Sequence, residues 1–200
     1  PKGHLLNLLR NRSTPWSVAL ESASLLLRGQ HVADRREASW VMRALGKRGA
    51  WSGVLFVLDH MRTAGMRTET SDFNAAIRAC GRGARTDVAM KLLADLRSHR
   101  LAPDVTTYNA VVTACAKTGK WTTALALMQQ VADASLQPDR TTYSAAIVAC
   151  QKGFKSKLAL KLVAQMRDGD LTPDVVTSSA VINACEIGKL WRAAMWTFRQ

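Results

Sequence analysis

A stretch of 35 residues constrains the fold of this chain more than any other feature. Residues 105–139 read VTTYNAVVTACAKTGKWTTALALMQQVADASLQPD, and a shift of 35 positions in either direction reaches a related stretch. Cysteine recurs at positions 80, 115, 150 and 185, and alanine at 89, 124, 159 and 194, without an insertion or deletion. Self-similarity at a fixed period of roughly 20–50 residues is typical of a solenoid or a propeller.

The period divides the 200 residues into six segments. We expect a degenerate first repeat over 1–34, a divergent repeat over 35–69, regular repeats over 70–104, 105–139 and 140–174, and a partial repeat over 175–200. The chain begins at Pro1 and ends inside a helical pattern. We therefore expect a processed chain or a fragment, with any targeting segment lying upstream.

Each regular repeat predicts two antiparallel helices. In residues 105–139 the first helix places Tyr108, Val111 and Cys115 on one face, and the second does the same with Ala124 and Leu127. A loop ending in Pro-Asp closes each unit, because proline cannot continue a helix. A glycine marks the turn between the two helices in four units: Gly83, Gly119, Gly153 and Gly188.

Two helices of this length cannot bury their apolar faces alone, so stacked neighbours must complete the burial. The pattern predicts an all-α solenoid with one concave face. The four cysteines are expected to be core residues in a reducing compartment. Equivalent positions on stacked helices stand about 8–10 Å apart, beyond the roughly 7 Å limit for a disulfide, and no CxxC pair is present to chelate a metal.

The net charge of +13 is the outlying feature of the composition. The excess is largest in residues 1–69, which hold eleven Lys and Arg against five Asp and Glu. A basic bias spread along an array suits a long polyanion such as nucleic acid. Solubility, or attraction to an acidic protein or membrane surface, is the alternative interpretation. No apolar run approaches the roughly 18 residues of a membrane span, so we expect no direct membrane insertion.

The unit resembles the pentatricopeptide repeat (PPR) of the pure 35-residue type. The resemblance rests on Val-Thr-Thr-Tyr-Asn-Ala, a glycine turn, an Ala-Leu helix and a Leu-x-Pro-Asp ending, and it is strongest from 70 to 185. It implies a right-handed superhelical solenoid of five to six repeats. It also implies single-stranded RNA binding on the concave face, one base per repeat, in a mitochondrion or plastid. The tetratricopeptide unit differs in period and in its Trp-Leu-Gly-Tyr signature.

The resemblance assigns base recognition to the fifth residue of each first helix and the last residue of the unit. An Asn amide donates and accepts toward a base edge, a Ser hydroxyl is smaller, and the carboxylate behind orients them. Helix and turn capping is the alternative explanation. By the family's code, the regular repeats would prefer 5′-U-U-G. The assigned base-contacting residues are Asn74, Asp104, Asn109, Asp139, Ser144, Asp174 and Ser179.

In the resembling family the second residue of each unit sandwiches a base. The assigned stacking residues are Thr106, Thr141 and Val176. Arg36 occupies this position in residues 35–69, where Ser39 with Glu69 also matches no clear code value. Hydroxyl side chains stack poorly, so these departures argue against tight sequence-selective binding.

A cation recurs at the end of the first helix in five of the six units. The resemblance places it against RNA phosphates, although attraction to the helix dipole, worth about 0.3–1 kcal/mol, would explain it alone. The assigned phosphate-contacting residues are Lys47, Arg82, Lys117 and Lys152, and Arg12 holds the same position in the first repeat. Tryptophan occurs at the start of four second helices, at positions 16, 51, 121 and 191. These rings could stack on bases, but their period favours packing against a neighbouring repeat.

No catalytic constellation is evident in the sequence. The four histidines stand alone, and no HxE with PCxxC, glycine-rich phosphate loop or GxSxG occurs. We therefore expect no enzyme, no metal and no cofactor. The predicted function is organellar RNA binding for processing, stabilisation or translation, with single-stranded RNA or rRNA as partner. The alternative is a structural subunit of a ribosome or membrane complex that acts as a protein-binding scaffold.

Overall fold

The computed structural model describes residues 2–11, 13–29, 34–190, 192 and 195. Within these ranges the chain forms eleven helices and no strand, which confirms the all-α prediction. Contacts divide the chain into two compact units, Pro1–Pro103 and Asp104–Gln200, which are described separately. Among the helices of the described residues, none combines the length and apolar character that a membrane crossing requires.

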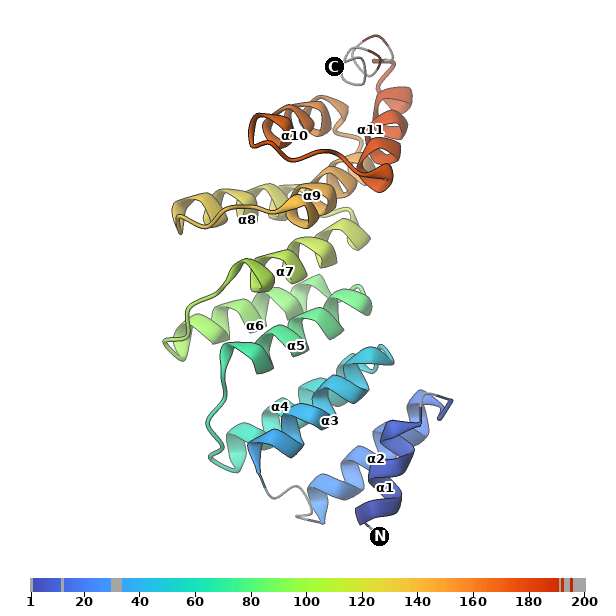
Figure 1. Ribbon diagram of the computed structural model, residues 1–200, viewed down its shortest axis with the longest axis vertical. Helices are drawn as coiled ribbons and strands as arrows, with labels where there is room; N and C mark the ends of the chain where they lie inside the picture. Colours follow the sequence, from blue (N-terminus) through green and yellow to red (C-terminus); the bar gives the residue numbers. More distant parts are fainter. Residues whose placement is uncertain (1, 12, 30–33, 191, 193–194, 196–200) are drawn as a thin grey trace. The chain divides into compact units, whose positions relative to one another are not determined.

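The N-terminal unit consists of three helix pairs (Figure 1). Its helices are α1 (Lys2–Arg10), α2 (Trp16–Arg28), α3 (Arg35–Lys47), α4 (Trp51–Thr63), α5 (Thr70–Arg82) and α6 (Thr86–Ser98). The two members of each pair pack on each other, and α3 contacts both α1 and α5. The first helices of the repeats therefore form one continuous layer in this unit, as the stacking argument predicts.

The C-terminal unit repeats this arrangement. Its helices are α7 (Val105–Thr118), α8 (Trp121–Asp133), α9 (Arg140–Lys152), α10 (Ser156–Asp168) and α11 (Val175–Ile187). α9 contacts both α7 and α11, so the first helices again lie in one layer (Figure 1). α8 packs on α7 and α9, and α10 on α9 and α11. Each second helix thus bridges its own first helix and the next one.

Aspartates start the first helices of the C-terminal unit. Asp104, Asp139 and Asp174 have extended backbones immediately before α7, α9 and α11. Each carboxylate accepts the N–H of the threonine three residues later, at 2.7 Å in α7 and 2.8 Å in α9 and α11. This bond satisfies an N–H that the first turn of a helix leaves without a partner. The Pro-Asp ending of one repeat therefore begins the helix of the next.

The turn glycines differ from the prediction in their physical role. Gly83 and Gly153 have φ angles of −80° and −83°, which any residue can adopt. The left-handed residue lies one position later, at Ala84 and Phe154, and of the four predicted turn glycines only Gly119 has a positive φ. A Cβ at Gly83 or Gly153 would lie 2.6 or 2.2 Å from a tryptophan ring atom. These two glycines leave space for a neighbouring side chain.

The recurrent cysteines lie in the core, which confirms their predicted role. All four are buried free thiols, at positions 80, 115, 150 and 185. Burial raises the pKa of Cys80, Cys115 and Cys150 to about 11, so these thiols remain protonated at neutral pH. The alanines Ala89, Ala124 and Ala159 are fully buried as well. Small side chains at these sites let neighbouring helices approach closely.

Candidate nucleic-acid interface

A groove crosses the first-helix layer of the C-terminal unit. Its volume is about 250 Å³, and its walls come from α7, α9 and α11. The lining residues are Thr113, Ala116, Lys117, Thr141, Ser144, Ala145, Val148, Lys152 and Val176. Five of them were assigned to RNA from the sequence: two for stacking, one for base contact and two for phosphates. The structure therefore brings members of all three predicted classes to one groove.

Asn109 on α7 is held by two residues of the following repeat. Its Nδ2 donates to Asp139 Oδ2 at 2.8 Å, and its Oδ1 accepts from the Thr142 hydroxyl. Asp139 Oδ1 in turn accepts from the Thr142 backbone N–H at 2.8 Å and lies 2.9 Å from the Thr142 hydroxyl, whose single proton is shared between Asp139 Oδ1 and Asn109 Oδ1. The predicted pairing of Asn109 with Asp139 is present as a direct hydrogen bond. Its role toward a base stays a prediction.

The orientation of the Asn109 amide follows from the chemistry of its partners. An ionised carboxylate only accepts hydrogen bonds, so the NH₂ of Asn109 must face Asp139. The carbonyl oxygen then faces the Thr142 hydroxyl, which donates. One N–H of Asn109 is left over for a ligand. Because Asn109 is partly exposed and both of its neighbours are anchored on α9, this donor has a defined direction.

Ser144 on α9 is oriented differently from the prediction. Its hydroxyl is hydrogen-bonded to the Thr177 hydroxyl and not to Asp174. Thr177 donates its own N–H and hydroxyl to Asp174 Oδ1, at 2.8 and 2.6 Å. These bonds lower the pKa of Asp174 below its ordinary value, with a smaller contribution from the Arg140 charge. The carboxylate therefore acts on Ser144 through Thr177, since a serine side chain is shorter than an asparagine.

The threonine in the third position of the first helices α7, α9 and α11 is the residue that sequence reasoning missed. Thr107, Thr142 and Thr177 are fully buried. Each donates its hydroxyl to the aspartate three residues earlier. The signal was visible as Asp-x-x-Thr recurring every 35 residues, a pattern typical of helix capping. Thr142 and Thr177 thus combine helix capping with a hydrogen bond to the fifth residue of the preceding first helix.

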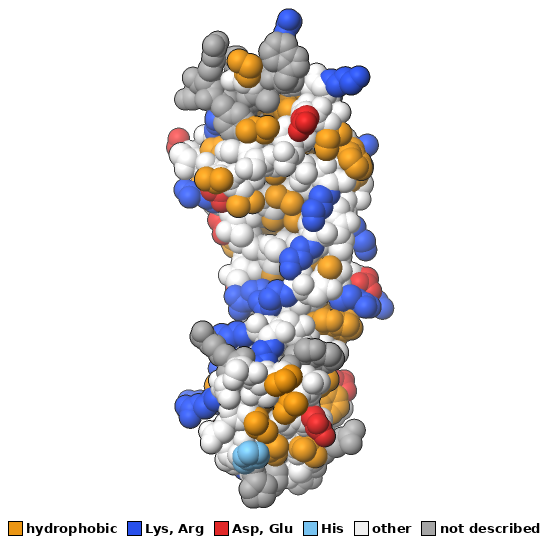
Figure 2. Space-filling view, turned by 90° about the vertical axis from the view of Figure 1, so that its right-hand side faces the viewer, with side chains coloured by type: hydrophobic (Ala, Val, Ile, Leu, Met, Phe, Trp, Pro, Cys, Tyr) orange, Lys and Arg blue, Asp and Glu red, His pale blue; other side chains and the backbone are white. Residues whose placement is uncertain are grey.

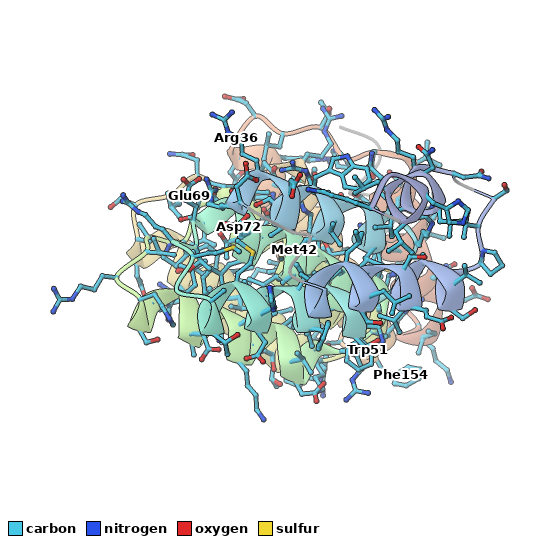
Figure 3. All side chains as sticks on the ribbon, turned by 90° about the horizontal axis from the view of Figure 1, so that it is seen from below. Arg36, Met42, Trp51, Glu69, Asp72 and Phe154 are labelled. Atoms are coloured by element: carbon cyan, nitrogen blue, oxygen red, sulfur yellow. The ribbon has the colours of Figure 1, made fainter. Side chains whose placement is uncertain are left out.

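In the N-terminal unit, the repeat 70–104 carries an acid where these helices have threonine, and it faces the divergent repeat 35–69. Asp72, 2% exposed, accepts from the Ser39 hydroxyl at 2.6 Å and from the Glu69 N–H at 3.0 Å. Arg35 pairs with both Asp72 and Glu69. Figure 3 shows Glu69 and Asp72 on the same side of this unit as Arg36, with Trp51 on the other side. Sequence reasoning paired Ser39 with Glu69 and overlooked Asp72, because an acid at this position breaks the repeat pattern.

The remaining predicted base and stacking residues are placed as follows. Thr106 on α7 and Ser179 on α11 are exposed, and Val176 is 60% exposed. Asn74 on α5 is only 5% exposed. Its predicted partner Asp104 belongs to the other unit, where it caps α7. An Asn74 amide that is nearly buried offers less surface to a base than Asn109 does.

The predicted phosphate contacts are all exposed cations, at Lys47, Arg82, Lys117 and Lys152. Lys152 Nζ donates to the Lys117 carbonyl oxygen at 3.0 Å, at the C-terminal end of α7. It therefore interacts with the end of the preceding first helix, and a phosphate would compete for its ammonium. Burial and the nearby Arg78 lower the pKa of Arg82. Arg12 lies outside the described residues. Figure 2 shows Lys and Arg side chains on the surfaces of both units, with few acidic side chains among them.

Two tryptophans pack on the following repeat, as their period predicts. Trp51 lies against Gly83 and under the Arg85 guanidinium, 4.8 Å from the ring centroid. Trp121 lies in the same way against Gly153, with the Lys155 ammonium 4.9 Å from its ring. Both rings belong to second helices and line no groove described above. The side chain of Trp16 and all of Trp191 fall outside the described residues. In the described ranges, no group of three His, Cys, Asp or Glu is placed to hold a metal.

Two family profiles match the chain. The PPR repeat family matches residues 103–152, and the pentatricopeptide repeat domain matches residues 56–118. No curated protein sequence matches significantly.

Several solved structures share the fold. The pentatricopeptide repeat protein PPR10 from maize, in complex with an 18-nt psaJ RNA element, is 27% identical with a TM-score of 0.72; the match covers 97% of this chain and 31% of that one. The PPR domain of Arabidopsis thaliana protein-only RNase P 1, in complex with tRNA, is 14% identical with a TM-score of 0.70, covering 79% and 83%. The latter shows the fold alone.

This chain therefore spans about a third of the length of PPR10. The profiles and the shared fold agree with the 35-residue helix pairs seen in both units. Residues 56–152 of this chain are pentatricopeptide repeats.

Proposed function

We propose that this chain binds single-stranded RNA along its layer of first helices. The observation that carries the proposal is the groove of the C-terminal unit, where Thr141, Ser144 and Val176 lie beside Lys117 and Lys152. An RNA strand needs this combination, because the cations meet phosphates while small polar and apolar side chains meet bases. The proposal is supported by the solved structure of PPR10, which is 27% identical and in complex with an 18-nt RNA.

The hydrogen bonds around Asn109 give a reason for a preference for uracil. The amide oxygen is occupied by Thr142, so the side chain offers a base one N–H donor. Uracil O4 accepts such a bond, whereas the N4 amino group of cytosine is itself a donor. Asp139 holds the donor in place from behind. Asn109 in the repeat 105–139 would therefore read U, and Ser144 in the next repeat would read G, as the family's code implies.

The biological role follows the family resemblance. We place the protein in a mitochondrion or plastid, where it would act by occupancy in RNA processing, stabilisation or translation. A protein-binding scaffold in a large organellar assembly is the second candidate, and the divergent repeat favours it. There Arg35, Glu69 and Asp72 satisfy one another, so the repeat 35–69 lacks the Asn–Asp arrangement of a reader.

The test is binding of the full chain to a short single-stranded RNA centred on UUG, compared with a scrambled RNA at two salt concentrations. We expect UUG to bind more tightly, and Asn109→Ala to remove this preference. Gln129→Ala is the matched control, because Gln129 also donates its amide to a carboxylate, at Asp133, but lies on the second helix α8. Equal, salt-sensitive binding of both RNAs would contradict base reading. Absence of binding to either would favour the scaffold.

A further inference from the structure

One side chain interrupts the regular pattern of the first-helix layer. Four repeats carry alanine at the sixth position of the first helix: Ala75, Ala110, Ala145 and Ala180. The repeat 35–69 carries Trp40 there, and its side chain is partly exposed. Ala145 lines the groove of the C-terminal unit, so this position belongs to the groove side of the layer. A large aromatic side chain on that side needs an explanation other than packing.

Trp40 forms a wall of two neighbouring hollows between α1 and α3. The larger, of about 830 Å³, is lined by Leu9, Arg10, Thr14, Trp40, Arg43, Ala44, Lys47 and Arg48. The smaller, of about 310 Å³, is lined by Leu6, Arg10, Asp34, Arg36, Glu37 and Trp40. Of the residues that the structure describes, Trp40 and Arg10 alone line both hollows. The larger falls in the size range of small-molecule sites, roughly 300–1,000 Å³.

The larger hollow is strongly cationic and has no acidic side chain in its lining. Arg48 is used by the fold, because its guanidinium donates to the carbonyl oxygens of Leu8, Leu9 and Asn11 at the end of α1. Arg10, Arg43 and Lys47 are exposed, and in the described part of the chain none of them has an ion-pair partner. Three cations around one hollow, one from α1 and two from α3, suit the phosphates of a nucleotide.

The positions of these side chains follow from the helix period. Trp40, Arg43 and Lys47 are spaced by three and four residues, so they share one face of α3. Their counterparts in the repeat 140–174 are Ala145, Val148 and Lys152, all of which line the groove there. The N-terminal unit has therefore gained an aromatic ring and a cation at two groove positions. An aromatic ring beside cations is the usual combination for single-stranded nucleic acid.

The smaller hollow differs in charge, because it adds two carboxylates. Asp34 accepts the Glu37 N–H at 2.8 Å through Oδ1, and Glu37 pairs with Lys2 at 2.8 Å. Carboxylate oxygens accept hydrogen bonds from the N1–H and N2 amino group of guanine, whereas the oxygens that flank N3–H in uracil would be repelled. A base stacked on Trp40 with its edge toward these carboxylates would therefore be guanine in preference to uracil.

We propose that Trp40, Arg10, Arg43 and Lys47 form a nucleotide site in which a guanine base stacks on the indole and its phosphates contact the cations. The inference rests on the proposed RNA binding and adds to it. The site belongs to the α1–α3 region, before the three regular repeats. By the strand direction that the family's code implies, it would take the nucleotides on the 5′ side of UUG.

The experiment compares GGUUG, UUUUG and an RNA with two abasic sites before UUG, each bound to the full chain. We expect GGUUG to bind wild type roughly tenfold more tightly than the abasic RNA, with UUUUG between them, because one stacked base is worth about five- to 150-fold. Trp40→Ala should remove the gain without unfolding the protein, since four repeats carry alanine there. Trp40→Phe should keep most of it. Phe56→Ala is the control, because Phe56 is an exposed aromatic on α4.

The outcomes separate this inference from the proposed function. If Trp40→Ala keeps the full gain, or if the abasic RNA binds as tightly as GGUUG, the Trp40 site is refuted while RNA binding through UUG stands. An equal gain from GG and UU refutes the guanine assignment. If wild type binds none of the three RNAs, the proposed function and this inference fail together.

Discussion

Replacing Gly153 by alanine tests whether the turn glycines are needed for space. The added Cβ would lie 2.2 Å from Trp121 Cδ1 and 2.9 Å from Cγ, far inside van der Waals contact. The backbone itself accepts alanine, because φ at Gly153 is −83°. The tryptophan ring must therefore move away from the turn and from the Lys155 ammonium above it.

The expected magnitude combines three contributions. Overpacking costs about 1–3 kcal/mol. Losing the cation–π contact costs about 0.5–1 kcal/mol at an exposed site. Alanine restricts the unfolded chain more than glycine, which offsets about 0.4–1 kcal/mol. We expect Gly153→Ala to lower the free energy of unfolding by about 1–3 kcal/mol, and Gly83→Ala to have a smaller effect since its Cβ would lie 2.6 Å from Trp51.

The assay is urea and thermal denaturation followed by far-UV circular dichroism. Gly169→Ala is the matched control, because Gly169 also caps a helix, with φ of −91°, and its Cβ would approach only carbonyl oxygens at 3.5 and 3.6 Å. That variant should be neutral or slightly stabilised. In a Trp121→Ala background, Gly153→Ala should cost little, because the clash is gone. The reasoning is refuted if Gly153→Ala is as stable as Gly169→Ala.

Three further predictions concern the candidate interface. Thr142→Val should lower the free energy of unfolding by about 0.5–1.5 kcal/mol in urea denaturation, since it removes the hydroxyl donor from Asn109 Oδ1 while Asp139 keeps the backbone N–H of residue 142, and Thr142→Ser should be milder. The double variant Lys117→Ala and Lys152→Ala should reduce the slope of log affinity against log salt for single-stranded RNA by about 1.4, and an unchanged slope would exclude these phosphate contacts. The pKa of Asp174 is lowered in the folded state, so its stabilisation is present above its ordinary value of 3.8 and is lost as the pH falls through the lower folded value. Asp174→Asn should therefore flatten the acid limb of the stability profile relative to wild type.

The helices were predictable because each repeat shows the same helix pattern again at the same positions. The period fixed where α5, α7, α9 and α11 begin, at Thr70, Val105, Arg140 and Val175. Proline and aspartate then gave the chemical reason for each boundary. The turns were harder. Glycine in a turn suggests a left-handed residue, yet Ala84 and Phe154 adopt that conformation. The adjacent glycines are required because a tryptophan 32 residues earlier in the sequence packs against them. Packing between residues far apart in the sequence cannot be recognised from the residues of the turn alone.

In the candidate site too, the sequence predicted some contacts and only the structure shows the others. Sequence placed Asn109 with Asp139, because a resemblance names both positions and the side chains are long enough to meet. It misplaced the partner of Ser144, since only coordinates show that a serine hydroxyl stops at Thr177. The sequence shows that Trp40 replaces an alanine of the other repeats, but it does not show which residues surround the ring. The cations around it become a site only when α1 is packed against α3.

The bond from the fifth residue of one repeat to the third residue of the next always spans 33 positions, as in Asn109 to Thr142 and Ser144 to Thr177. A repeat duplicated in tandem therefore forms the same hydrogen bond with the repeat before it and the repeat after it. An array of this kind can lengthen by duplication without a compensating substitution. The pair Ser39 and Asp72 obeys the same spacing with different chemistry. The repeat 35–69 therefore depends on Asp72 of the repeat 70–104, and the two could be moved into another array only together.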